Sequence, residues 1–111
     1  MSTRATICIK EKDEQDIWVY HHCDGYPDDV GSDLKKYLKT LKYGWIAYEI
    51  VNDLIKDRAD LKDDGYELTS GQHGDEAYAY LINCDDQTIK CYKIGYDQFE
   101  WKPKDEVEIP D

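Results

Sequence analysis

Alternating apolar and polar positions predict a β-hairpin at the start of the chain. Residues 3–10 and 17–23 are rich in β-branched and aromatic side chains, and the charged residues between them, 11–16, are typical of a loop. If the chain turns at Asp13 and Glu14, each strand keeps one apolar face. The core face of this hairpin is then predicted to hold Ala5, Ile7, Ile9, Trp18, Tyr20 and His22.

Two helices are predicted in the middle of the chain. In residues 30–41, apolar side chains recur with the spacing of one helix face, acidic residues precede them and lysines follow, as the helix dipole favours. Gly44 is the expected end of this helix, and the second helix is predicted for residues 45–58. Its polar side is expected to carry Asp53, Lys56 and Asp57, and its apolar side Ala47, Ile50, Val51, Leu54 and Ile55.

The last part of the chain returns to strand patterns after an acidic loop, residues 60–65. A short strand is predicted for residues 66–70. A second hairpin is predicted for residues 76–94, turning at Asp86 and Gln87. One face of it then holds Tyr78, Tyr80, Ile82, Cys84, Ile89 and Cys91, with Cys84 and Cys91 as diagonal neighbours.

The predicted elements follow the order ββααβββ, which is typical of an α+β fold. We expect a single α+β domain, residues 1–111, in which an antiparallel sheet of about five strands carries two helices packed on one face. Val107 and Ile109 alternate with acidic residues, so the pattern also allows a short C-terminal strand at the edge of the sheet.

Composition narrows the range of partners. The 111 residues include 25 acidic and 14 basic side chains, which give a formal net charge of -11. Because phosphate backbones bind clustered lysine and arginine, we expect no nucleic-acid partner. The apolar runs are too short for a signal peptide or a membrane helix, so we expect a cytoplasmic protein without a membrane partner.

Aromatic side chains are more numerous than the core of such a small domain needs, because the chain holds ten tyrosines and three tryptophans. Several of them should therefore reach the face of the sheet that the helices leave open. Exposed aromatic side chains often mark a protein interface, although tyrosine is also a good strand residue.

The four cysteines, Cys8, Cys23, Cys84 and Cys91, lack the C-x-x-C spacing of zinc or redox sites. We expect free thiols that pack as small apolar groups. Catalysis by the Cys23 thiol is disfavoured, because the adjacent His22 points to the opposite face of the strand, whereas His21 shares the face of Cys23.

Potential chemistry concentrates in residues 20–29, where a strand pattern ends and a helix pattern begins. Imidazole, thiol, phenol and carboxylate groups share this corner, and a second polar turn at residues 71–75 adds another histidine and carboxylate. Arg4 is expected to pair with Asp24 or Asp75 and so to lock the two turns together. The candidate binding residues are Arg4, His21, His22, Asp24, Tyr26, His73 and Asp75.

The same two turns allow a metal-binding and a purely structural interpretation. Two imidazoles and two carboxylates suit zinc, manganese or iron, so His22, Asp24, His73 and Asp75 form an alternative metal site if the turns meet. Structurally, Asp24 before Gly25 is an ordinary Asx turn, and a histidine at a strand end commonly bonds a backbone carbonyl. Because no H-E-x-x-H spacing supports a metal, we expect no cofactor.

Three stretches of the chain resemble a family of small phage and prophage proteins. They are residues 2–7 (STRATI), residues 20–27 (YHHCDGYP) and residues 73–80 (HGDEAYAY). Members of that family begin with an S/T-R-x-x-I strand, carry an H-x-D-G-Y-P turn and have an H-G-D segment before a tyrosine-rich strand. The resemblance implies a phage or mobile-element context and no particular reaction, ligand or catalytic residue.

These observations together favour a non-catalytic, acidic interaction module of phage or mobile-element type. An aromatic sheet face and a negative surface are expected to bind a protein partner that the sequence does not identify. The alternative is a metal-binding or small-ligand-binding protein that uses the turns at residues 21–24 and 73–75. An exposed sheet edge would also allow a homodimer.

Overall fold

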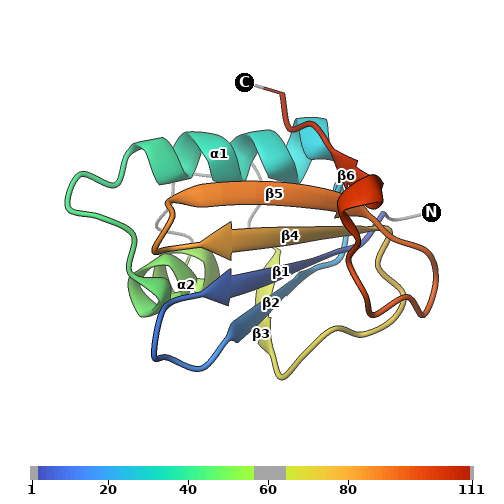
Figure 1. Cartoon of the computed structure of the whole chain (residues 1–111), viewed down its shortest axis with the longest axis horizontal. Coiled ribbons are helices and arrows are strands. Elements are labelled where there is room, and N and C mark those ends of the chain that lie inside the picture. Colours follow the sequence, from blue (N-terminus) through green and yellow to red (C-terminus); the bar gives the residue numbers. More distant parts are fainter. Residues whose placement is uncertain (1–2, 57–64, 111) are drawn as a thin grey trace.

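The computed structural model describes residues 3–56 and 65–110, which form one sheet and two helices (Figure 1). The predicted order ββααβββ is confirmed, and the short C-terminal strand is present. The elements are β1 (Ala5–Lys10), β2 (Ile17–His21), α1 (Ser32–Lys39), α2 (Ala47–Ile55), β3 (Tyr66–Thr69), β4 (Tyr78–Asn83), β5 (Thr88–Lys93) and β6 (Glu106–Val107).

The sheet has six strands in the order β3-β2-β1-β4-β5-β6, and it is mixed. β1 and β4 run parallel, whereas the other neighbouring pairs are antiparallel, so the expectation of a fully antiparallel sheet is wrong. The chain leaves the first hairpin through β2 on one side of β1, passes through both helices, returns as β3 beside β2, and then crosses to the other side of β1 as β4. A parallel pair needs such a long crossover, and alternation of side chains along a strand does not reveal which neighbour it will have.

The first hairpin differs by one residue from its predicted register. Ile7 lies opposite Val19 and Ile9 opposite Ile17, so the pairing is centred on Asp13, which has a left-handed φ of 64°. A slip of one residue reverses the faces of a strand. Trp18, Tyr20 and His22 therefore lie on the outer face, away from the helices, and Ile17, Val19 and His21 face the core.

The second hairpin keeps its predicted faces but turns at different residues. Tyr80 lies opposite Cys91 and Ile82 opposite Ile89, which centres the turn on Asp85 and Asp86. Because this shift is two residues, the same side chains still share a face. Cys84 and Cys91 are not diagonal neighbours, and both are buried free thiols.

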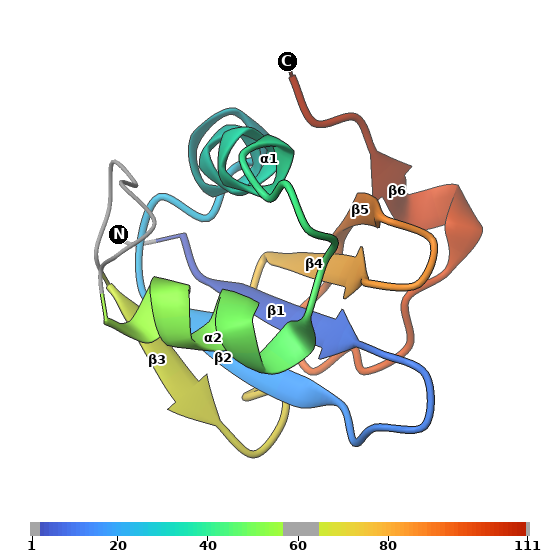
Figure 2. The ribbon, with the colours of Figure 1, turned by 90° about the vertical axis from the view of Figure 1, so that its left-hand side faces the viewer.

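Both helices cover one face of the sheet and enclose the main core (Figure 2). A wider helical turn, Pro27–Gly31, leads directly into α1. Fully burying a large aliphatic side chain contributes about 2 kcal/mol, so this layer supplies much of the stability. Its inward side chains include Val30, Leu34, Leu38, Ile50 and Leu54 from the helices and Ile7, Ile9, Val19, Tyr80 and Ile82 from the sheet.

Three details of the helices differ from the prediction. α1 ends at Lys39, before Gly44, because Thr40 already bonds back to the carbonyl of Tyr37. Ile55 is exposed, and Asp53 is half-buried because it accepts a hydrogen bond from the Tyr37 hydroxyl. The predicted end of the second helix at residue 58, the outward Asp57 and the acidic loop up to residue 64 lie outside the described residues.

The outer face of the sheet is partly covered by the segment that follows β5. Trp101 packs its ring 5.9 Å from Trp18 and 5.9 Å from Tyr92, beside a small apolar cluster that includes Ala79 and Ile94. Figure 2 shows this orange-to-red segment on the side of the sheet opposite the helices. The aromatic side chains do reach the outer face, as expected, but Tyr92 is buried there instead of open to solvent.

After β6, the C-terminal segment packs into the main core and bonds to α1. Ile109 is buried in the main core, only 6% exposed, and its carbonyl accepts a hydrogen bond from Lys35 Nζ at 3.1 Å. The hydroxyl of Ser32 donates to the carbonyl of Pro110. These contacts tie the C-terminal segment to α1 beside this edge of the sheet.

Candidate binding site

The two polar turns singled out in the sequence meet at the side chain of Tyr20. Its hydroxyl lies 3.1 Å from each carboxylate oxygen of Asp75. His73 stacks on the Tyr20 ring at 3.9 Å between centroids, and His22 meets the same ring edge-on at 4.8 Å. The structure therefore brings His22, His73 and Asp75 together around Tyr20. The sequence pattern had predicted Tyr20 on the core face of the first hairpin instead.

Arg4 pairs with Asp75, and Asp24 is placed differently. Arg4 Nε lies 3.4 Å from Asp75 Oδ2, with both side chains more than a third exposed. Solvent screening limits such a pair to less than about 1 kcal/mol. Asp24 is exposed and adopts a left-handed φ of 54°, so it is the turn residue, whereas Gly25 is needed because a Cβ there would lie 2.9 Å from Ala5 Cβ.

Two other predicted residues lie apart from this cluster. His21 is fully buried on the helix side of the sheet, where its ring lies 4.5 Å from that of Tyr66. Tyr26 is 45% exposed, and its ring lies against Tyr78. The one-residue change in register explains the position of His21, because it turned this side chain from the outer face to the core.

Glu76 organises the second turn and was missed as a functional residue in the sequence analysis. Its buried carboxylate accepts hydrogen bonds from the backbone N–H groups of His73, at 2.9 Å, and Gly74, at 2.6 Å. Gly74 has a φ of 103°, and a Cβ there would lie 2.9 Å from Asp97 Oδ1. A carboxylate placed two residues after a glycine in a polar turn is the signal that could have revealed this role.

The alternative metal site is not assembled in the part of the chain that the structure describes. His22 Nε2 lies 3.2 Å from Glu67 Oε1, and His73 Nε2 lies 3.0 Å from Thr69 Oγ1. Among residues 3–56 and 65–110, no three histidine, cysteine or acidic side chains are arranged to hold a metal ion. The cluster around Tyr20 instead binds itself together and joins the turn at residues 71–75 to β2 and β3.

Three buried thiols and the Tyr20 phenol have raised pKa values, which favour their protonated forms. Burial raises the pKa of the Cys8 and Cys91 thiols to about 12 and that of Cys84 to about 11. Burial, and then the hydrogen bond to Asp75, raise the pKa of the Tyr20 phenol to about 12. Thiolates and phenolates, not their conjugate acids, attack substrates, so these four groups are unsuited to catalysis near neutral pH.

A groove lies where β2 begins and β3 ends, beside α2; we call it the edge groove. Its volume is about 480 Å³, and Asp16 and Asn52 add polar groups to its wall. Leu68 is 63% exposed and Tyr48 62% exposed, an unusual position for two large apolar side chains that face the same groove. The apolar lining of the edge groove is Ile17, Trp18, Tyr48, Val51 and Leu68.

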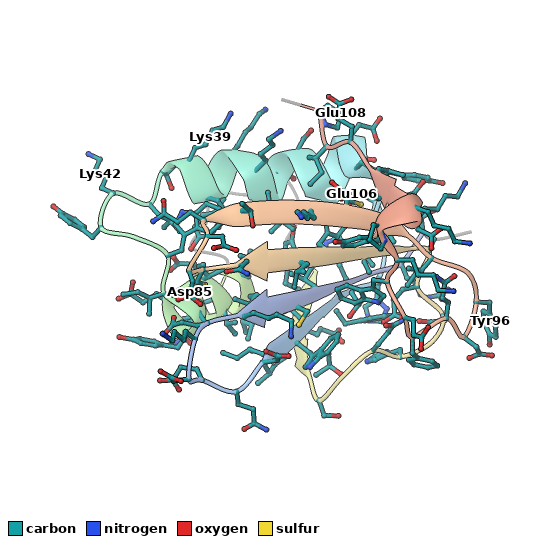
Figure 3. All side chains as sticks on the ribbon, in the orientation of Figure 1. Lys39, Lys42, Asp85, Tyr96, Glu106 and Glu108 are labelled. Carbon is teal, nitrogen blue, oxygen red and sulfur yellow. The ribbon has the colours of Figure 1, made fainter. Side chains whose placement is uncertain are left out.

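Charge is unevenly distributed around the edge groove. Asp16 lies in its wall, where the carboxylate is 2.6 Å from Lys10 Nζ, and Glu67 is exposed on the outer face of β3. Glu49 on α2 lines a different pocket together with Lys42. Lys39 and Lys42, at the end of α1 and just after it, project away from the sheet (Figure 3). Figures 1 and 2 both place α1 and β3 on opposite sides of the molecule, so Lys39 on α1 does not pair with Glu67 on β3.

Comparisons with protein-family models, curated proteins and solved structures gave no match to this chain. The resemblance to small phage proteins therefore rests on the three motifs quoted above. No helix within residues 3–56 and 65–110 has the length and apolar character needed to cross a membrane.

Proposed function

We propose that this chain is a non-catalytic protein-interaction module that binds a partner at the edge groove. The observation that carries the proposal is the groove itself, with Leu68 and Tyr48 exposed beside Ile17, Trp18 and Val51. Apolar side chains held open to water at a concave surface gain free energy when a partner covers them. The three phage-like motifs support a phage or mobile-element context, and the four free thiols fit a reducing cytoplasm.

Charge specifies the kind of partner surface. The chain carries a formal net charge of -11, Asp16 lines the groove, and Glu67 is exposed on the outer face of β3. An acidic surface accelerates association with a basic partner and disfavours an acidic one. The partner is therefore a protein with an apolar element flanked by lysine or arginine, and its binding weakens as salt is added.

Affinity capture with matched variants tests this function. The immobilised chain is compared with a Leu68→Ser, Tyr48→Ser double variant and with Tyr96→Ser, which alters an exposed tyrosine at the far tip of the segment after β5 (Figure 3). The expected partner is retained by the parent and by Tyr96→Ser, is lost with the double variant, and elutes with salt. Circular dichroism confirms that all three proteins are folded.

Retention of the same partner by the double variant would contradict the proposal and place the interface elsewhere on the molecule. Loss with Tyr96→Ser and not with the double variant would assign binding to the segment after β5. Because the substitutions lie at exposed side chains, we expect each to change the free energy of unfolding by less than about 0.5 kcal/mol.

A further inference from the structure

The edge strand β3 offers backbone groups to a binding partner. Within the described residues, β3 pairs with β2 alone and forms one end of the sheet. In an antiparallel pair, every second residue turns its N–H and C=O away from the neighbouring strand. β3 can therefore form a further set of main-chain hydrogen bonds with an extended segment laid beside it.

The two faces of β3 present different side chains to such a segment. On the helix side, Leu68 faces the edge groove below α2. On the outer side, Glu67 and Thr69 contact the imidazoles of His22 and His73. Because side chains alternate along a strand, an added strand would direct every second side chain toward the apolar groove and the others toward Glu67.

Charge argues against a second copy of this chain as the added strand. Pairing two β3 edges would bring together two molecules that each carry a formal net charge of -11. It would also place the exposed carboxylates of Glu67 from both copies in the same joint sheet, where like charges destabilise pairing. A strand with lysine or arginine at alternate positions would place opposite charges there instead.

We propose that β3 binds, by strand addition, an extended segment of a partner protein in which apolar side chains alternate with lysine or arginine. The apolar side chains enter the edge groove beside Leu68, and the basic side chains lie on the outer face near Glu67. This inference rests on the proposed function and specifies how the partner is held: main-chain hydrogen bonds give affinity and the groove gives selectivity.

A synthetic peptide of alternating lysine and valine tests this mode of binding. Its binding to the whole chain is measured by fluorescence anisotropy. The comparison peptides are two N-methylated forms, one methylated at every lysine and the other at every valine so that each blocks one edge, and a block peptide of identical composition. We expect the alternating peptide to bind and N-methylation to weaken it about tenfold, because the methyl groups remove donors to β3. Leu68→Ser should weaken the alternating peptide as well.

The outcomes separate this inference from the function on which it rests. Equal binding by the unmodified peptide and by both N-methylated forms, made on either edge, would overturn strand addition while leaving the groove as a side-chain binding site. Strand addition would also be overturned if no peptide binds while the parent chain captures a partner that the Leu68→Ser, Tyr48→Ser double variant does not capture. If neither assay responds to substitutions in the groove, both proposals fail.

Two further measurements complete the test. Nuclear magnetic resonance should show slower amide exchange at Glu67, Leu68 or Thr69 when the alternating peptide is bound, since an added strand protects the outward N–H groups. Sedimentation of the chain alone should show a monomer. A dimer that Leu68→Ser dissociates would instead assign the edge to a second copy and contradict the proposal.

Discussion

The two edges of the sheet are finished in opposite ways. At the β6 edge, the chain continues past a two-residue strand, buries Ile109 and bonds to Ser32 and Lys35 on α1. At the β3 edge, Leu68 is exposed and a groove separates the strand from α2. Edge strands are a liability in proteins unless they are covered, charged or used. The contrast is between an edge beside which the chain buries a large aliphatic side chain and an edge where a large aliphatic side chain stays exposed.

The largest expected effect comes from changing one aliphatic residue at each edge. Ile109→Ala should lower the free energy of unfolding by about 3 kcal/mol, because it leaves a cavity under the C-terminal segment. Leu68→Ala should change it by less than about 0.5 kcal/mol, because the side chain is already in water. Guanidinium unfolding of both variants measures the difference. Similar losses at the two sites would end the distinction between the packed side chain beside β6 and the exposed side chain on β3.

The stability of the protein should depend nearly as much on the turn at residues 71–75. Glu76→Ala removes the carboxylate that accepts the N–H groups of His73 and Gly74, and we expect a loss of about 2 kcal/mol. Glu76→Gln keeps one acceptor oxygen and should lose about half as much. Thermal unfolding compares the two variants, and an equal stability of Glu76→Ala and the parent would show that the turn is held by other contacts.

The bond between Tyr20 and Asp75 joins β2 to that turn and should depend on pH. The pKa of Tyr20 is raised from 10.0 to about 12, so the folded state favours the protonated phenol. The contribution of the protonated Tyr20 phenol to the stability of the folded state is fully present below pH 10 and is lost as the pH rises through about 12. Tyr20→Phe should cost about 1 kcal/mol at neutral pH and progressively less in that alkaline range.

Unfolding experiments from neutral to alkaline pH measure this dependence, with Tyr43→Phe as the matched control because Tyr43 is 97% exposed. The stability gap between the parent and Tyr20→Phe should close as the pH rises, while the Tyr43→Phe gap stays near zero. A gap that does not change with pH would mean that the hydroxyl of Tyr20 contributes through packing alone.

The smallest expected effect is at Arg4, although the sequence makes this residue prominent. Its partner Asp75 lies 3.4 Å away, and both side chains are more than a third exposed. Arg4→Ala should therefore lower the free energy of unfolding by less than about 1 kcal/mol, with a loss that shrinks further in added salt. Calorimetry at low and high salt checks this, and a loss above about 2 kcal/mol would identify the pair as a true lock between the turns.

The sequence predicted most of the helices and strands, because whether a segment forms a helix or a strand depends largely on residues that are near one another in sequence. The helical spacing of Leu34 and Leu38 and the alternation through Tyr80 and Ile82 depend on neighbours in sequence, and both appear in the core as expected. Register and strand order depend on turn conformation and on distant segments. The left-handed Asp13 moved Tyr20 and His21 to unexpected faces, and the parallel pairing of β1 with β4 left no mark in either strand.

The candidate site was predictable only in part for the same reason. The sequence indicated that the turns holding His22 and His73 would be neighbours, and their contacts with Tyr20 agree with that. The sequence did not predict the edge groove. Leu68 and Tyr48 lie on separate elements, and each has the pattern of an ordinary strand or helix residue. A site formed between distant elements becomes visible only when the chain is folded.

The parallel pairing of β1 with β4 also has a consequence for the order of folding. The two hairpins can each form early, because their strands are close in sequence. The central pair, however, joins Ala5 to Tyr78, so it closes a long loop of chain that includes both helices and β3. During synthesis the first hairpin therefore waits, with one side of β1 unpaired, until the ribosome has released the second half of the chain.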